Sequence, residues 1–390
     1  MDLQYPPDLR QLRDEVRTWL GENAPRDERP REAKAIREYD LAWQQAQWAG
    51  GWAGIDWPQE YGGRGLTLLQ QLIWHEEYAR CGLAVMDSCF VGLRHAAPTL
   101  IAMASQEQKS FHLPKILRGE SLWCQGFSEP GAGSDLASLS TRATVDGDAL
   151  IVNGQKIWTS FANMADYQEL LVRTGEPDSK HRGITWAICD MHSPGVEVRE
   201  IETIDGGADF CEVFYDNVRI PLSNVVGEIN SGWAVAMSTL SFERGTAFTA
   251  NQVTLAVMVE ELIALANGGL CRNGLPAVIE DRDVARRLAT ARAEVASLRA
   301  MTYAGICRNL RADTPGPEGS MLKLYYADLV KEVTRLALDI LGPEMLQYPS
   351  NTMAGNWTGR YLWALAQGIG GGTSEIQRNI IGERVLGLPR

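Results

Sequence analysis

The sequence predicts an α+β protein in which a β-rich middle segment lies between two helical segments. In the first third of the chain, apolar residues recur at helical spacing. Examples are Leu9, Leu12, Val16 and Leu20. The middle third changes to short runs of β-branched and aromatic residues. The last third returns to long helical repeats, which are typical of a helical bundle.

These changes of pattern divide the chain into three expected domains. We expect an all-helical N-terminal domain over residues 1–120, a small β-barrel or sandwich over residues 121–230, and a helical bundle over residues 231–390. The N-terminal part contains two clear helices. The first ends at a Gly and a Pro near residue 25, and the second ends at Cys81-Gly82.

Turn dipeptides and strand-like runs organise the expected middle domain. Asp146-Gly147 and Asn153-Gly154 are each expected to form a hairpin turn. Further short strands are expected over residues 183–191, 196–204 and 211–220.

The expected bundle is built from long helices. They cover residues 231–266, nearly unbroken, then 281–310 and 320–342, and a last helix starts near Thr373.

Composition excludes several classes of protein. The 390 residues carry a formal net charge of −12, which argues against nucleic acid and anionic membranes as partners. Seven scattered cysteines without a C-x-x-C pair fit a reducing compartment. The five histidines lack metal-ligand spacing, so no metal site is expected. No apolar run is long enough to span a membrane, and we expect a cytoplasmic protein.

Three local motifs are ambiguous when each is taken alone. The stretch "EPGAGSD", from Glu129 to Asp135, is either a plain tight turn or a site for a phosphate or carbonyl group. Trp158, at a strand end, is on its own better explained as a packing residue. The run "GIGGGTSEIQR", from Gly368 to Arg378, is a Gly-rich loop that leads into a helix. No Rossmann or Walker A motif is present.

The order of the segments removes this ambiguity. "WPQEYGGRG", "WCQGFSEPGAGSD", "NGQKIWTS", "CEVFYDNVRIP", a long helix with Glu-Arg, and "GGGTSEIQR" follow one another as in the acyl-CoA dehydrogenase family, which the chain resembles over nearly its whole length. The resemblance implies a helical domain, a middle β-domain and a C-terminal four-helix bundle. It also implies FAD between the last two domains, an acyl-CoA substrate, and electron-transfer flavoprotein as the electron acceptor.

The same resemblance assigns roles to individual residues. Ser134 would contact the pantetheine or phosphate part of the thioester. The residues that would contact FAD are Gln125, Phe127, Ser128, Trp158, Thr159, Ser160, Thr373 and Glu375.

The family reaction removes a proton from the α-carbon and a hydride from the β-carbon of an acyl thioester. Because the α-proton is weakly acidic, a carboxylate base in a dry pocket is needed. Many members keep this base in the C-terminal loop, where this chain has Gly371. A second subgroup places it on the long helix before an arginine, which corresponds to Glu243 and Arg244. On a helix, Glu243 shares an apolar face with Leu240, where a carboxylate is costly unless it is paired or used. The helix alone is therefore compatible either with a structural ion pair or with a catalytic role for Glu243. Together, the empty loop and the resemblance predict that Glu243 is the base and that Arg244 supports the site electrostatically.

The chain departs from the family at two motifs for the dinucleotide half of FAD. R-x-x-F-G is not recognisable, and the Q-x-x-G-G position is occupied by residues 339–343, beginning with Asp339. A carboxylate facing a pyrophosphate is repulsive. A homologous partner subunit could supply these contacts, so both a homo-oligomer and a hetero-oligomer remain open. The sequence is also compatible with a flavin oxidase or monooxygenase on the same fold, with a subunit that mainly scaffolds FAD, and with a carrier protein in place of CoA.

Overall fold

The structure is a computed structural model that describes residues 5–83, 87–246, 250–268, 277–309, 316–317, 319–346 and 357–389. The side chains of residues 177, 242–246, 309, 344 and 346 are outside this description. The chain forms two compact units. The bundle unit comprises Met1–Ala24, Thr67–Val85 and Arg244–Arg390, and the sheet unit comprises Pro25–Leu66 and Met86–Glu243. The predicted domain boundaries at residues 120 and 230 stay a prediction.

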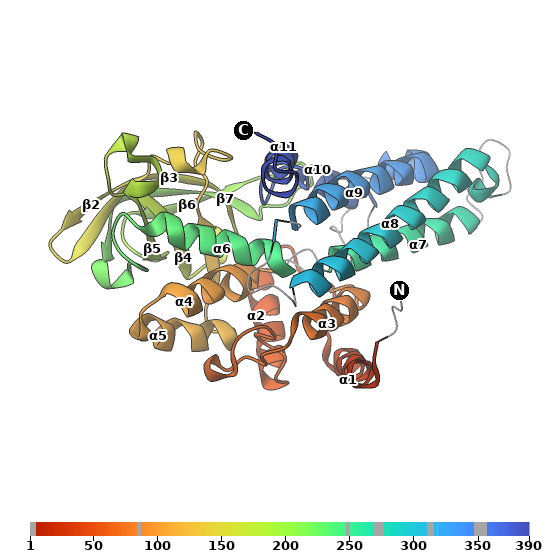
Figure 1. Cartoon of the computed structure of the whole chain (residues 1–390), viewed down its shortest axis with the longest axis horizontal. Helices are drawn as coiled ribbons and strands as arrows, with labels where there is room; N and C mark the ends of the chain where they lie inside the picture. Colours follow the sequence, from red (N-terminus) through yellow and green to blue (C-terminus); the bar gives the residue numbers. More distant parts are fainter. Residues whose placement is uncertain are drawn as a thin grey trace. The chain divides into compact units, whose positions relative to one another are not determined.

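The bundle unit is held together by apolar faces of its long helices. Leu262, Leu298, Val333 and Ala364, from four different helices, belong to one buried core. Helices α7, α8 and α9 lie alongside one another (Figure 1). The helices of the unit are α1 (Pro7–Asn23), α3 (Leu68–Arg80), α7 (Asn251–Asn267), α8 (Arg282–Asn309), α9 (Gly319–Leu341), α10 (Trp357–Ala366) and α11 (Ser374–Ile380).

The sheet unit contains one sheet, in the order β1-β4-β2-β3-β7-β6 with β5 paired to β4. Its strands are β1 (Trp123–Gly126), β2 (Arg142–Asp146), β3 (Ala149–Ser160), β4 (Tyr167–Arg173), β5 (Ile184–Asp190), β6 (Val196–Ile201) and β7 (Phe210–Pro221). Leu100, Leu113, Trp186 and Val235 join the helices to the sheet in one buried core. The helices that contribute to this core are α4 (Ala97–Met103), α5 (Gln106–Leu117) and α6 (Gly232–Thr246, through residue 243), and α2 (Ala33–Ala49) contributes Ile36 to a separate buried cluster.

The predicted fold class, with helical, β and helical regions in order, is confirmed. The helix expected over residues 231–266 is described as two helices, α6 and α7, with residues 247–249 outside the description. Strands β1 and β4 and helices α2, α4, α5 and α10 were not predicted individually. Among the described residues, every helix is too short or too polar to cross a lipid bilayer.

The expected hairpin turn at Asn153-Gly154 is wrong, because the pair lies inside strand β3. The pairing of β3 with β7 shifts register there, and Asn153 Oδ1 accepts a hydrogen bond from the Asn217 backbone at 2.9 Å. Gly154 has φ 148°, and a Cβ on it would lie 2.7 Å from Thr141 Cα. The glycine therefore serves a bulge and a close backbone approach. The predicted turn between β2 and β3 is present, with Gly147 and Asp148 as its two loop residues after Asp146.

Candidate active site

Strand β3 carries a second bulge at the predicted flavin-contacting tryptophan. Pairing with β7 shifts between Lys156 and Thr159, and Trp158 adopts φ 59°. A bulky residue in this left-handed region is strained and is found mainly where function requires it. Trp158 is 57% exposed, and its ring meets the edge of Phe210 at 6.2 Å between centroids. Trp158 is therefore presented at the surface, and its interpretation as a core packing residue is wrong.

The segment after β1 is bonded to this bulge. The backbone N–H of Ile157 donates to the carbonyl oxygen of Ser128 at 3.0 Å. Lys156 Nζ donates to the carbonyl oxygen of Phe127 at 3.1 Å. The structure thus brings Phe127 and Ser128 next to Trp158, although some thirty residues separate them in the sequence. Phe127 itself is buried, and Ser128 is half-buried.

A buried ion pair fixes the start of the "EPGAGSD" loop. Lys156 is fully buried, and its Nζ lies 2.8 Å from Glu129 Oε1. The same carboxylate accepts from the backbone N–H of Ser140 at 2.6 Å, from its hydroxyl at 2.8 Å, and from the N–H of Thr141 at 2.9 Å. Burial lowers the pKa of Lys156 to about 8, against the opposing attraction of Glu129, so the ammonium stays charged at neutral pH.

The acid stability of the protein depends on Glu129. Burial alone would raise the pKa of this carboxyl group, but the Lys156 charge and the hydrogen bonds lower it to about 2. A folded-state pKa below the unfolded value stabilises the fold above the unfolded pKa, and this contribution disappears as the pH falls toward 2. We expect a loss on the order of 3 kcal/mol between pH ~4.5 and ~2. Thermal unfolding of the wild type and of Glu129→Gln across this range measures it, and equal slopes for the two proteins would contradict it.

The remaining predicted contacts in the sheet unit differ in their surroundings. Thr159 is fully buried, and its Oγ1 has no hydrogen-bond partner among the described residues. Ser160 is half-buried at the end of β3 and pairs with Phe210. Ser134 is exposed on the loop after Gly131 and Gly133, where an added Cβ would meet nothing within 4 Å. The loop therefore has open space for a ligand on its outer side.

The Gly-rich loop in the bundle unit is held by two buried polar side chains. Lys323 Nζ donates to the carbonyl oxygens of Gly370, at 2.5 Å, and Gly372. Gln377 Nε2 donates to the carbonyl oxygens of Gly371 and Gly372 at 3.2 and 3.1 Å. Gly371 and Gly372 have φ 64° and 91°, values that favour glycine. The loop is thus tightly anchored and offers no side chain at the family position of the base.

The helix after this loop begins as predicted. Thr373 is its N-cap, and the Thr373 hydroxyl accepts from the backbone N–H of Ile376 at 3.3 Å. Glu375 is exposed, and its Oε1 lies 3.8 Å from Arg378 Nη1. Both predicted contacts are therefore on the first turn of α11, in the bundle unit.

The predicted base lies in helix α6, but its side chain is outside the described residues. Glu243 and Arg244 belong to the helical segment Gly232–Thr246, and only their backbone is described.

The unusual Asp339 has a partner in the bundle unit. Arg287 Nη1 lies 2.6 Å from Asp339 Oδ2, which ties α8 to α9. The negative charge at this departure from the family motif is therefore balanced within the chain.

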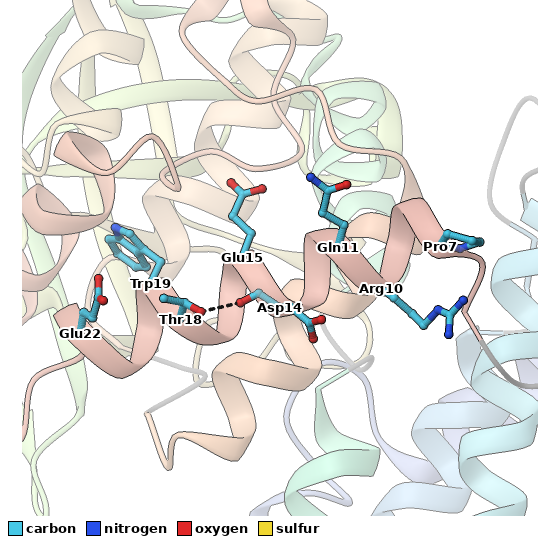
Figure 2. Close-up of a pocket in the computed structure, with 8 residues that line it drawn as sticks. All are labelled: Pro7, Arg10, Gln11, Asp14, Glu15, Thr18, Trp19 and Glu22. Carbon is cyan, nitrogen blue, oxygen red and sulfur yellow. Dashed lines mark hydrogen bonds between the residues drawn. The ribbon is translucent and has the colours of Figure 1, made fainter.

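A groove on the surface of helix α1 holds none of the predicted residues (Figure 2). The residues that line it are Pro7, Arg10, Gln11, Asp14, Glu15, Thr18, Trp19 and Glu22. All come from one face of one helix, and the Thr18 hydroxyl bonds to the Asp14 carbonyl oxygen at 2.9 Å. Ligand pockets are enclosed by several elements. We therefore assign this groove no function.

Sequence reasoning missed the buried charges that support the site. The burial of Lys156 could have been predicted from the sequence, because Lys156 falls on the same side of the β3 alternation as the buried Leu150 and Val152. The pattern gave a weaker indication for Lys323, which lies in a mostly apolar stripe of a helix. In both cases the partner lies far away in the sequence, and no local pattern indicates it.

Models of one family match nearly the whole chain. The N-terminal, middle and C-terminal domains of acyl-CoA dehydrogenase match residues 6–120, 124–218 and 230–386. The chain is 37% identical to acyl-CoA dehydrogenase IpdE1 of Mycobacterium tuberculosis, with 98% of each chain covered. It is 34% identical to acyl-CoA dehydrogenase FadE26 of the same organism, with 100% of this chain and 99% of the relative covered.

Solved structures agree with these matches. The structure named "Tcur3481-Tcur3483 steroid ACAD" is 33% identical, covers 100% of both chains and superposes with a TM-score of 0.87. The ChsE4-ChsE5 complex from Mycobacterium tuberculosis is 32% identical over 100% of both chains, with a TM-score of 0.83. The exposed Trp158, the "EPGAGSD" loop and the Gly-rich loop thus occur in a chain that belongs to the acyl-CoA dehydrogenase family of flavoprotein oxidoreductases.

Proposed function

We propose that this acyl-CoA dehydrogenase uses FAD to introduce an α,β double bond into an acyl-CoA thioester, giving the trans-2-enoyl thioester. The observation that carries the proposal is Trp158, an exposed indole on a strained bulge that Ser128 and Lys156 hold in place. A large aromatic side chain kept at the surface at a conformational cost is well suited to pack on a planar ring. Family membership supplies the identity of that ring.

The residues around the bulge fit a flavin. Thr159 Oγ1 is buried without a partner among the described residues, so it has a hydrogen bond to offer a ligand. We infer that FAD is held by Gln125, Phe127, Ser128, Trp158, Thr159, Ser160, Thr373 and Glu375. When bound, FAD supplies the acceptor for the hydride from the β-carbon. Ser134, on the open loop, would bind the pantetheine or phosphate part of the thioester.

Glu243 is the proposed base that removes the α-proton. The alternative family position is Gly371, in a loop whose carbonyl groups are bonded to Lys323 and Gln377. With no carboxylate at that position, the glutamate on α6 takes the role. Arg244 would support the charge balance of the site without contacting the reacting atoms.

Relatives that cover the full chain support an inference about the substrate and the partners. One is described as a steroid ACAD and another as a complex of two named chains. We infer a bulky, ring-bearing acyl group, for which the Gly-rich loop leaves space. We also infer a homologous partner subunit that supplies the FAD contacts missing from the two family motifs. Electron-transfer flavoprotein would accept the electrons, in the cytoplasm.

Anaerobic titration of the FAD-loaded protein with acyl-CoA thioesters tests the proposal. We expect bleaching of the visible flavin band, one enoyl-CoA formed per FAD, and faster bleaching with a steroid-derived acyl-CoA than with straight-chain ones. Electron-transfer flavoprotein should reoxidise the protein faster than air does. Rapid reoxidation by air with peroxide or an oxygenated product would instead identify an oxidase or monooxygenase. Bleaching with acyl-pantetheine carriers but not with CoA thioesters would contradict the substrate assignment.

A further inference from the structure

The side-chain amide of Gln125 contacts two buried side chains of the sheet unit. Its Nε2 lies 2.7 Å from Glu169 Oε1 and 3.2 Å from His95 Nδ1. The side chain of Glu169 is 0% exposed and that of His95 is 4% exposed. Gln125 itself is half-buried.

The fold brings these three residues together from separate elements. Gln125 on β1 and Glu169 on β4 are direct partners in a parallel strand pair, so their side chains lie on the same face. His95 comes from the π-helical turn Gly92–Ala96, a type of turn that is rare and often occurs at functional sites. The Phe90 ring packs edge-on against the imidazole at 4.7 Å between centroids, which fixes its plane.

The chemistry of the partners decides which atom of the Gln125 amide faces outward. An ionised carboxylate can only accept hydrogen bonds, so the amide nitrogen must face Glu169. The 2.7 Å distance is at the short end of the range for an N–H···O hydrogen bond. The same amide nitrogen lies 3.2 Å from His95 Nδ1, and this nitrogen accepts the second amide hydrogen in the tautomer that carries its proton on Nε2. Both hydrogens of the amide are thus used, and Oε1 is the atom available to a ligand.

We propose that Glu169 and His95 are positioning residues that hold the Gln125 amide with Oε1 toward the flavin, where it accepts from the N3–H group. The oxidised isoalloxazine ring carries one N–H donor, at N3, so an amide oxygen has one possible partner on its edge. This inference rests on the proposed function, because it assumes that Gln125 contacts FAD. It adds two residues, Glu169 and His95, that orient the Gln125 amide. This orientation determines that Gln125 binds the edge of the flavin ring that carries N3–H.

Binding of FAD and of N3-methyl-FAD to the deflavinated protein tests the inference. A neutral hydrogen bond corresponds to roughly a 10-fold difference in affinity. N3-methylation should therefore weaken binding to the wild type by ~10-fold more than binding to the Gln125→Met variant. Glu169→Gln should remove most of that discrimination. The new amide at this position can donate as well as accept, so it no longer fixes the orientation of the Gln125 amide. Equal discrimination in the wild type and in Gln125→Met would overturn the proposal.

A double-mutant cycle separates positioning from general stability. If Glu169 acts through Gln125, Glu169→Gln should weaken FAD binding in the wild-type background and have no further effect in the Gln125→Met background. Equal effects in both backgrounds would show a structural role and contradict the inference. Should Glu169→Gln fail to fold, His95→Leu serves the same cycle, because it removes one of the two acceptors.

Glu76→Gln is the matched control. Glu76 is a carboxylate of the bundle unit that is 2% exposed and accepts from Gln252 Nε2 at 3.0 Å. Its replacement should leave the discrimination against N3-methyl-FAD unchanged, and a loss as large as that in Glu169→Gln would overturn the proposal. These measurements are made on the protein assembled with its partner subunit. Failure of that wild-type assembly to bind FAD at all would contradict the proposed function itself, which distinguishes the two results.

Discussion

Replacement of Glu243 by glutamine should leave FAD bound and reduce the rate of flavin reduction by acyl-CoA by at least ~10³-fold. General bases contribute typically 10²–10⁴-fold. The upper part of that range applies because the α-proton is weakly acidic and water in a closed site is a poor substitute. Glutamine keeps the shape of glutamate and removes only its basicity. Stopped-flow anaerobic reduction of the two proteins at saturating substrate measures the effect.

Glu375→Gln is the control for this prediction. Glu375 is an exposed carboxylate close in sequence to the loop position where many relatives keep the base. Its replacement should change the affinity for FAD but leave the rate of reduction of the bound flavin within ~3-fold of the wild type, since it removes no group that accepts the proton. A slow Glu375→Gln variant together with a normal Glu243→Gln variant would move the base from α6 to α11.

Replacement of Lys156 by methionine should destabilise the protein by about 3 kcal/mol, because it leaves the Glu129 carboxylate buried without its cation. The cost lies at the low end of the usual 3–5 kcal/mol because Ser140 and Thr141 still donate to Glu129. The same variant loses the bond to the Phe127 carbonyl oxygen, which helps to hold the segment beside Trp158. We therefore expect weaker FAD binding as well as a lower unfolding temperature.

Two further variants distinguish the buried pair from ordinary charge effects. Adding Glu129→Gln to Lys156→Met should restore part of the stability, since no buried charge is then left unpaired. Arg219→Ala removes an exposed cation that pairs with Asp146 and Asp148 in the same unit, and should cost less than ~1 kcal/mol. Thermal unfolding followed by tryptophan fluorescence compares the variants. A double variant less stable than Lys156→Met alone would contradict this account of the pair.

The long helices could be predicted because each buries one apolar face. Helices α8 and α9 begin and end within a few residues of the ranges expected from apolar periodicity, and α1 and α3 end within a few residues of their expected ends. Strands β1 and β4 could not. Strand β1 is four residues long, and β4 is buried almost throughout its length, including Gln168 and Glu169, so it lacks the alternation that identifies a strand.

Some features of the candidate site could likewise be predicted from the sequence, and others could not. The resemblance to the family identified the segments around Gln125 and Trp158, and the structure shows Ser128 bonded to the β3 bulge. The φ of Trp158 could not be predicted, because the extra residue in β3 appears only when its pairing with β7 is known. The supporting contacts of Lys156 and Glu169 depend on residues distant in sequence, which periodicity and local motifs do not pair.

The fate of deuterium in the substrate tests the central claim most directly. An acyl-CoA fully deuterated at the α- and β-carbons, incubated anaerobically with the FAD-loaded protein, should give an enoyl-CoA that has lost one deuterium from each carbon. The rate of flavin reduction should fall several-fold with either label. A product that keeps all of its β-deuterium, or that contains an oxygen atom from air when oxygen is admitted, would contradict α,β-dehydrogenation by this protein.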